Sequence, residues 1–251
     1  MIEKVNIPEI SQKHLHGIKD LTVDDINKIL ELSNFFKLNN REKDKNYPIL
    51  KGRTIINLFF EPSTRTLISF EIAAKRLGAD VINMNIEGSS LRKGESLHDT
   101  AQTLGAMSPD LVIIRHRIDD ASKLIAETVN CPVINAGEGT NEHPTQALLD
   151  AYTIINNKRS LENITVAICG DLEHSRVARS NYYLLKKMKS NVRFVYPEFF
   201  KPKDLNKYDV ETFTKLEEGI ANADIIMMLR IQNERISDMN LPSKESYFDE
   251  F

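Results

Sequence analysis

The chain has 251 residues, of which 41% are apolar and 27% are charged. This composition is typical of globular proteins, not of disordered or collagen-like chains, and the length favours two domains over a single small core. The net charge of −3 supplies no general attraction for nucleic acid. No apolar run approaches the roughly 20 residues that span a bilayer, and the N-terminus lacks the plan of a secretory signal. We therefore expect a cytoplasmic protein without nucleic-acid or membrane partners.

The sequence contains only two cysteines, Cys131 and Cys169. This number suits a reducing compartment, and it offers neither a disulfide framework nor a paired-cysteine zinc site. We expect both side chains to be small buried hydrophobic groups.

Strand and helix patterns alternate along the chain after a first helix that Thr22 is placed to cap. The first series of strands is expected at 54–60, 80–85, 110–116 and 132–136, and its helices at 63–77, 96–104, 119–129 and 144–157. A second series has strands at 165–171, 191–197 and 223–230 and helices at 174–189 and 216–222. Such alternation is typical of parallel sheets covered by helices. We therefore predict an α/β fold of two doubly wound parallel-sheet domains, residues 1–150 and 151–251.

The loop after the first strand has the composition of an anion site, because ligands of open parallel sheets bind beyond the carboxyl ends of the strands. Ser63 is placed to cap the next helix. Arg65 lies in the first turn, where a cation opposes the helix dipole at a cost of about 0.3–1 kcal/mol unless an anion binds there. The loop therefore indicates a phosphate site, and a simple cap beside a solvated arginine is the alternative.

Three later strand ends carry further candidates. Lys93 lies in a Gly/Ser-rich charged loop, a composition that is usually just solvated. Arg115 ends its strand, where it either extends to solvent or points toward a ligand, and the position favours the ligand. His143 and Gln146 flank the start of a helix and can face one ligand carbonyl together.

The second half repeats this pattern of cations at strand ends. Arg176 and Arg179 lie early in a helix, against its dipole, and imply a second anion. Arg230 ends the last predicted strand, and Gln232 is two residues further along, so both can project from one face. Arg235 nearby has the pattern of a surface charge.

Several common motifs are absent from the sequence. No P-loop, dinucleotide-binding glycine fingerprint or H-E-x-x-H sequence occurs, so nucleotide, dinucleotide and zinc-protease functions have no motif behind them. His14 and His16 have no partner at metal-ligand spacing, and we expect a structural or surface role for them.

Four segments, FFEPSTRTLISFE, SSLRKGESLHDT, INAGEGTNEHPTQALLD and LRIQNER, resemble those of the aspartate carbamoyltransferase family in order and spacing. STRT and HPTQ also occur in ornithine carbamoyltransferases, but the lysine before GES and the R-x-Q-x-E-R segment are similar to the aspartate branch. The resemblance covers nearly the whole chain. It implies transfer of the carbamoyl group of carbamoyl phosphate to L-aspartate in pyrimidine biosynthesis, with no metal or organic cofactor.

The resemblance also implies the site residues. Residues 1–150 would bind carbamoyl phosphate and residues 151–251 aspartate. The carbamoyl phosphate ligands would be Ser63, Thr64, Arg65, Thr66, Ser89, Lys93, Arg115, His143 and Gln146. Among these, the catalytic residues would be Arg65, Thr66, Lys93, Arg115 and His143. The aspartate ligands would be Lys93, Arg176, Arg230 and Gln232.

Ser89 and Lys93 are similar to family residues that a neighbouring subunit supplies, so the resemblance implies a homotrimer with shared active sites. A regulatory subunit or another pathway enzyme stays open as a partner. Family members continue past SKESYFDEF with a strand, an H-P-x-P loop and a helix. We therefore expect an incomplete second domain with weakened closure and reduced stability, and low or lost activity.

Two alternatives remain at this point. The first is an ornithine-type carbamoyltransferase, although a positively charged acceptor disfavours three arginines in the acceptor domain. The second is a truncated oligomer that binds carbamoyl phosphate or a partner protein without turnover.

Overall fold

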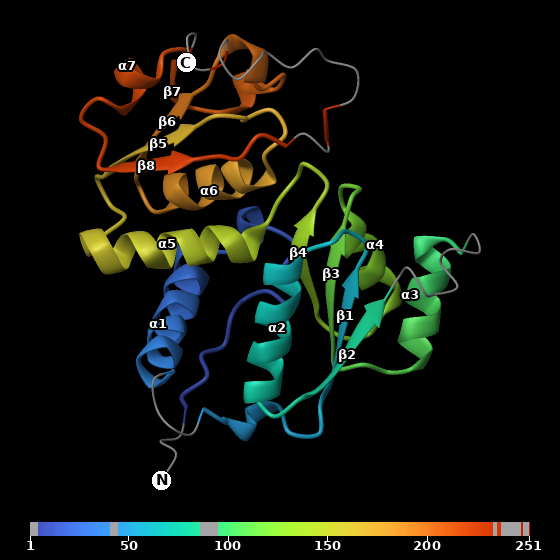
Figure 1. The fold of residues 1–251 in the computed structure, drawn as a ribbon. Coiled ribbons are helices and arrows are strands. Elements are labelled where there is room, and N and C mark those ends of the chain that lie inside the picture. Colours follow the sequence, from blue (N-terminus) through green and yellow to red (C-terminus); the bar gives the residue numbers. More distant parts are fainter. Residues whose placement is uncertain (1–4, 41–44, 86–94, 233–234, 237–246, 248–250) are drawn as a thin grey trace. The chain divides into compact units, whose positions relative to one another are not determined.

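A computed structural model of the chain describes residues 5–40, 45–85, 95–232, 235–236, 247 and 251. The chain forms two compact units, Met1–Leu148 and Leu149–Phe251, each with its own parallel sheet. The predicted fold class, two parallel sheets covered by helices, is therefore confirmed (Figure 1).

Unit 1 contains the first half of the elements in chain order. They are η1 (Ile18–Asp20), α1 (Val23–Asn39), η2 (Pro48–Leu50), β1 (Thr54–Phe59), α2 (Thr64–Arg76), β2 (Asp80–Asn85), α3 (Leu97–Ala106), β3 (Leu111–His116), α4 (Ala121–Thr128), β4 (Val133–Glu138) and the start of α5 (Pro144–Lys158). The strands pair in the order β2-β1-β3-β4. Phe59 of β1 lies opposite Arg115 of β3, which aligns the carboxyl ends of these two strands.

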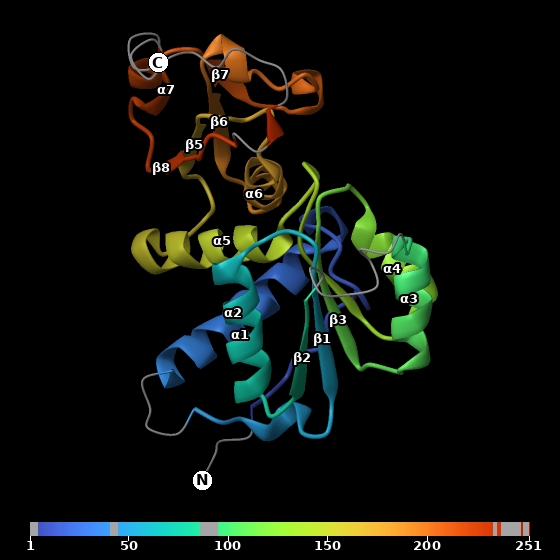
Figure 2. The same ribbon diagram turned by 45° about the vertical axis from the view of Figure 1, so that its right-hand side comes forward.

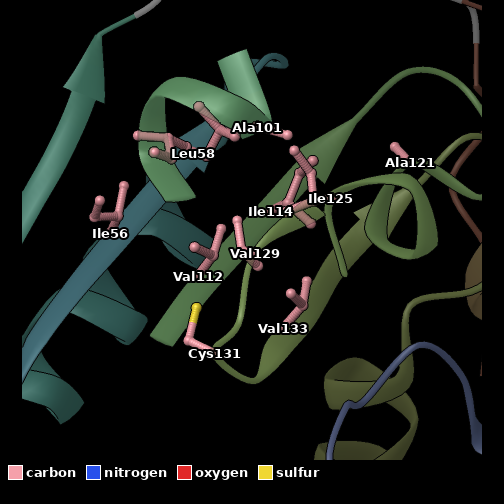
Figure 3. Packing of buried hydrophobic residues seen from close by; sticks show 11 residues of the cluster. Ile56, Leu58, Ala101, Val112, Ile114, Ala121, Ile125, Val129, Cys131 and Val133 are labelled. Atoms are coloured by element: carbon pink, nitrogen blue, oxygen red, sulfur yellow. The ribbon is translucent and has the colours of Figure 1, made fainter. Parts of the chain in front are cut away.

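The two faces of the first sheet bury different side chains because successive residues of a strand point to opposite faces. Ile56 and Leu58 pack with residues of α3 and α4 in one cluster (Figure 3). Ile55 packs in a second cluster with Ala74 of α2. The sheet is therefore a middle layer, with α2 on one face and α3 and α4 on the other (Figures 1 and 2).

The helix ends of unit 1 follow local sequence signals. Thr22 caps α1 as predicted, and it forms a capping box with Asp25. Gly78 follows α2 with a φ of 86°, a left-handed conformation that glycine adopts without steric cost. These signals are local, and for this reason the sequence predicted the helices well.

Unit 2 contains β5 (Thr165–Cys169), α6 (Arg176–Lys187), β6 (Asn191–Val195), η5 (Glu198–Phe200), η6 (Leu205–Lys207), β7 (Glu211–Phe213), α7 (Leu216–Ile220) and β8 (Ile225–Met228). Its strands pair in the order β7-β6-β5-β8. Cys169 and Val195 pack on the face covered by α7, and Phe194 contacts Tyr182 of α6 on the other face. The sequence did not predict β7, whose three residues are too few to show a period.

The expectation for the two cysteines is confirmed. Both thiols are free and buried, and burial raises the pKa of Cys169 to about 11. No described helix has the length and apolar character needed to cross a bilayer.

Candidate active site

The N-terminus of α2 presents hydroxyl groups and a cation beyond the end of β1. Ser63 is the N-cap residue, but its side chain makes no capping hydrogen bond, so this part of the prediction is wrong. Its ψ of 86° differs from the values of 165° and 161° at the Thr22 and Ser96 caps, whose side chains do accept capping bonds. The first turn is closed instead by the backbone, where Leu67 N donates to Ser63 O at 3.0 Å.

The remaining residues of this turn are open to a ligand. Thr64 and Arg65 are exposed, and Thr66 is half-buried. Within the described part of the chain, no hydrogen bond or ion pair holds the Arg65 guanidinium. A free guanidinium beside the amide groups of a helix N-terminus is a suitable receptor for a phosphate group.

Arg115 points across the sheet edge and not into solvent, since its side chain is only 14% exposed. Its Nη1 donates to Ala136 O in β4 at 3.1 Å, and its Nε lies 3.4 Å from Glu61 Oε2 in the loop after β1. Phe60 N also donates to Arg115 O at 2.8 Å. The guanidinium is therefore fixed between the ends of β1 and β4. Its orientation toward a ligand stays a prediction.

His143 leaves the loop after β4 and leads directly into α5. Glu138 N donates to Glu142 O at 3.2 Å and closes this loop. The imidazole is buried, with its Nδ1 3.4 Å from Thr145 Oγ1. Gln146 is half-buried in the first turn of α5.

These groups come together because β1, β3 and β4 are adjacent and parallel, so their carboxyl ends lie at one edge of the sheet. The N-terminus of α2 follows β1, Arg115 lies near the end of β3, and His143 follows β4, so all three belong to this edge. Such an arrangement can bind an anion and polarise a carbonyl group beside it. Ser89 and Lys93, which were predicted to join this site, lie outside the described residues.

In unit 2, Arg176 is the first residue of α6 and is 5% exposed. Arg230 follows β8 and is exposed, and its Nη2 donates to Gln232 Oε1 at 3.1 Å. The two side chains are therefore in contact, and their projection from one face toward a ligand stays a prediction. Arg179 interacts with Asp204 at 3.7 Å and with Glu173 O, so its surroundings are those of a structural ion pair.

The sequence did not single out Asp171, which organises the polar residues of unit 2. The carboxylate is fully buried. Its Oδ2 accepts Gln232 N at 3.0 Å, and its Oδ1 lies 2.9 Å from His174 Nδ1. Arg235 is not a simple surface charge, because it donates to His174 O at 2.9 Å. The position of Asp171 directly after a buried strand could have identified it from the sequence, because such carboxylates commonly orient neighbouring groups.

Comparison with known proteins assigns the chain to a family. Residues 13–156 match the family described as aspartate/ornithine carbamoyltransferase, carbamoyl-P binding domain. The chain is 53% identical over 250 residues to an aspartate carbamoyltransferase catalytic subunit from Pelagibacter ubique, covering 99% of this chain and 80% of that protein. The chain therefore belongs to the aspartate/ornithine carbamoyltransferase family.

Within the family, the relatives at this level of identity come from the aspartate branch, as the motifs indicated. A catalytic subunit from Methylorubrum populi is 51% identical, covering 96% of this chain and 76% of that protein. The aspartate transcarbamoylase of Trypanosoma cruzi, solved with N-(phosphonacetyl)-L-aspartic acid, has a TM-score of 0.83 and 31% identity, covering 93% of this chain and 80% of that chain. An ornithine carbamoyltransferase from Pyrococcus furiosus has a TM-score of 0.78 and 28% identity, with coverages of 88% and 72%.

Proposed function

We propose that this chain is the catalytic polypeptide of an aspartate carbamoyltransferase, which converts carbamoyl phosphate and L-aspartate to N-carbamoyl-L-aspartate and phosphate. The observation that carries the proposal is the meeting of a helix N-terminus, a fixed arginine and a buried histidine at one edge of the first sheet. An anionic group next to a carbonyl is the chemistry that this edge suits.

In unit 1 we assign carbamoyl phosphate to the edge of the sheet. The phosphate group would be bound by hydroxyl groups, backbone amides and the guanidinium of Ser63, Thr64, Arg65 and Thr66. Thr66, Arg115 and His143 would donate to the carbamoyl oxygen and stabilise the negative charge that develops there. Gln146 would bind the amide end of the carbamoyl group.

In unit 2 we assign aspartate to Arg176, Arg230 and Gln232. Carbamoyl phosphate and aspartate together bring about four negative charges, and an unpaired buried charge is very costly. The two guanidinium groups supply the positive charge that the two carboxylates of aspartate require. A positively charged acceptor such as ornithine has no carboxylate to offer a second arginine. The ligand in the similar structure from T. cruzi, N-(phosphonacetyl)-L-aspartic acid, has the same combination of charged groups.

The reaction we propose is direct attack by the neutral aspartate amine on the carbamoyl carbon. A carbon–nitrogen bond forms, the bond from carbon to the phosphate oxygen breaks, and the departing phosphate takes the amine proton. The assigned residues include no carboxylate that could act as a general base. Orientation and stabilisation of the oxyanion would supply most of the acceleration.

The proposal extends to assembly and location. Ser89 and Lys93 match family residues that reach a neighbouring active site, so we propose a homotrimer in which each site is shared. The two buried free thiols fit a reducing compartment, and we propose a cytoplasmic enzyme of pyrimidine biosynthesis.

The test is the formation of carbamoyl-aspartate by protein whose oligomeric state is measured by light scattering, with ornithine as a parallel acceptor. Any turnover should occur with aspartate and not with ornithine. Arg65→Ala should lower kcat/KM by about 10³-fold, since it removes a charge-assisted donor to the phosphate. The matched control is Arg53→Ala, which removes an exposed arginine that pairs with Asp110 at the start of β1 and should leave kcat/KM within twofold.

Turnover with ornithine would show that the chain is an ornithine-type carbamoyltransferase instead. A folded trimer that binds phosphate without turnover would identify a binding protein and reject the proposal. An equal fall in kcat/KM in both arginine variants would contradict a phosphate site at the N-terminus of α2.

A further inference from the structure

Two carboxylates join the start of α4 to the loop that leads to His143. Asp119 Oδ1 accepts hydrogen bonds from Thr140 N at 2.8 Å and Asn141 N at 3.0 Å. In the opposite direction, Glu138 Oε2 accepts Ser122 N at 2.8 Å. We call Asp119 and Glu138 the crossed carboxylates, since each comes from one segment and binds backbone N–H groups of the other.

Glu138 supplies a helix cap that α4 lacks within its own sequence. The N-cap residue Asp120 has a left-handed backbone, with a φ of 58°, and its side chain makes no capping hydrogen bond. An acidic side chain near a helix N-terminus is favourable because the first N–H groups lack partners within the helix. Glu138 therefore does from β4 what an N-cap residue normally does from the helix itself.

The burial of Glu138 is costly, which argues for a specific role. The residue is 1% exposed, and its Oε1 has no hydrogen-bond partner among the described residues. Burial raises the pKa of this carboxyl. Burying a carboxyl with one unsatisfied oxygen lowers the stability of the fold. The position of Glu138 therefore indicates a role other than stability.

Asp119 reaches its partners only because residue 139 is a glycine. A Cβ atom at Gly139 would lie 1.9 Å from Asp119 Oδ1, and the backbone there has a φ of 44°. Gly139 N also donates to His116 O at 3.0 Å. The loop is therefore tied to the end of β3 and to Asp119, and its last residue leads into His143.

We propose that Asp119 and Glu138 are positioning residues, which hold the loop 139–142 so that the His143 imidazole stays aimed at the ligand edge of the sheet. The crossed carboxylates touch no reacting atom, and they act through the backbone that carries the histidine. The choice of the carbamoyl oxygen as the target of the imidazole rests on the proposed function. The fixing of the imidazole does not depend on it.

Asp119 is the residue to change, since it is exposed and its loss should leave the fold intact. Asp119→Ala removes the oxygen that accepts both hydrogen bonds, whereas Asp119→Asn keeps an oxygen that can accept from the same N–H groups. The matched control is Asp120→Asn, which alters the adjacent carboxylate, whose side chain pairs with Lys123. A histidine ring signal assigned by its loss in His143→Gln, measured by NMR with labelled histidine, reports on the imidazole without turnover.

In Asp119→Ala, we expect hydrogen exchange of the Thr140 and Asn141 amides to accelerate at least about tenfold, and the His143 ring signal to shift or broaden. The kcat value should fall about tenfold, with the KM for aspartate within twofold, because the aligned donor is lost while aspartate binding is not. Asp119→Asn should restore most of kcat, and Asp120→Asn should match the unchanged protein in every readout.

An unchanged ring signal in Asp119→Ala would overturn the proposal, whatever the activity. An unchanged kcat in an active enzyme would do the same. If the unaltered chain shows no carbamoyl transfer, the proposed function fails, and the ring signal and amide exchange still decide whether the crossed carboxylates position His143.

Discussion

Unit 1 and unit 2 hold their candidate ligand groups by different means. In unit 1, Arg115 is part of a strand, paired in register with Phe59, and its side chain donates to a neighbouring strand. In unit 2, Gln232 lies beyond the end of β8, where its backbone N–H donates to Asp171 and its side chain accepts from Arg230. Groups on regular elements are placed more accurately than groups on loops. Under the proposed assignment of substrates, substitutions in unit 1 should change the rate of reaction at the carbamoyl carbonyl. Substitutions in unit 2 should change the affinity for aspartate.

The arginines near the starts of α2 and α6 differ in their exposure to solvent. Arg65 is exposed at a helix N-terminus, where no ion pair with the described residues occupies it. Arg176 also begins a helix but is 5% exposed. The guanidinium of Arg65 is thus open to solvent, whereas that of Arg176 is enclosed within the fold of unit 2.

The largest effect should come from Arg115→Ala, which removes a fixed donor from unit 1 and leaves Glu61 without its cation. We expect kcat/KM for carbamoyl transfer to fall by about 10³-fold. Arg115→Lys should recover part of the loss, because lysine keeps the charge but not the planar fork. Steady-state kinetics measures both. Arg117→Ala, which removes an exposed arginine two residues away, is the control, and an equal loss there would refute a specific role for Arg115.

The next effect should come from Arg176→Ala in unit 2. We expect the KM for aspartate to rise by about 10–100-fold, the usual weight of a charge-assisted hydrogen bond to a carboxylate. Binding of carbamoyl phosphate, measured by calorimetry, should change less than twofold. A matching loss of carbamoyl phosphate affinity would break the comparison, since the two units would then not divide the substrates.

The smallest effect concerns stability. Asp25 accepts hydrogen bonds from Ser11 and Thr22, and Asp25→Ala should destabilise unit 1 by about 1–2 kcal/mol. Those hydrogen bonds hold the pKa of the carboxyl well below its usual range. Because the pKa is lowered on folding, this stabilisation is present above about pH 4 and is lost as the pH falls further.

Urea unfolding followed by circular dichroism at neutral and acidic pH measures this contribution. Ser175→Ala is the matched change in unit 2, because the Ser175 hydroxyl caps α6 by accepting from Ala178 N at 3.1 Å. It should cost about 1 kcal/mol without changing the pH dependence. An unchanged acid dependence in Asp25→Ala would show that other carboxyl groups govern the acid response.

The sequence by itself determined the local structure and the position of most candidate residues. Apolar periodicity, Gly78 and the Thr22 cap are signals within a few residues. Such signals predicted the helix that carries Arg65, the strand that carries Arg115 and the helix that begins directly after His143. The order of α/β units also placed these residues at strand ends. The exception was β7, where three residues gave no period.

Only the tertiary structure decided the strand order and the partners of the site residues. Glu61 and Asp171 bind candidate site groups that are distant along the chain, such as Gln232, which donates to Asp171 across 61 positions. Asp119 accepts from the backbone of the loop before His143. The Ser63 hydroxyl was predicted as a cap from its position alone, and the backbone at that residue turned it away from that role. Helix and strand signals depend on neighbours in the sequence, whereas pairing of polar groups depends on which segments packing brings together. For this reason the motif residues could be identified from the sequence, and the carboxylates that orient them could not.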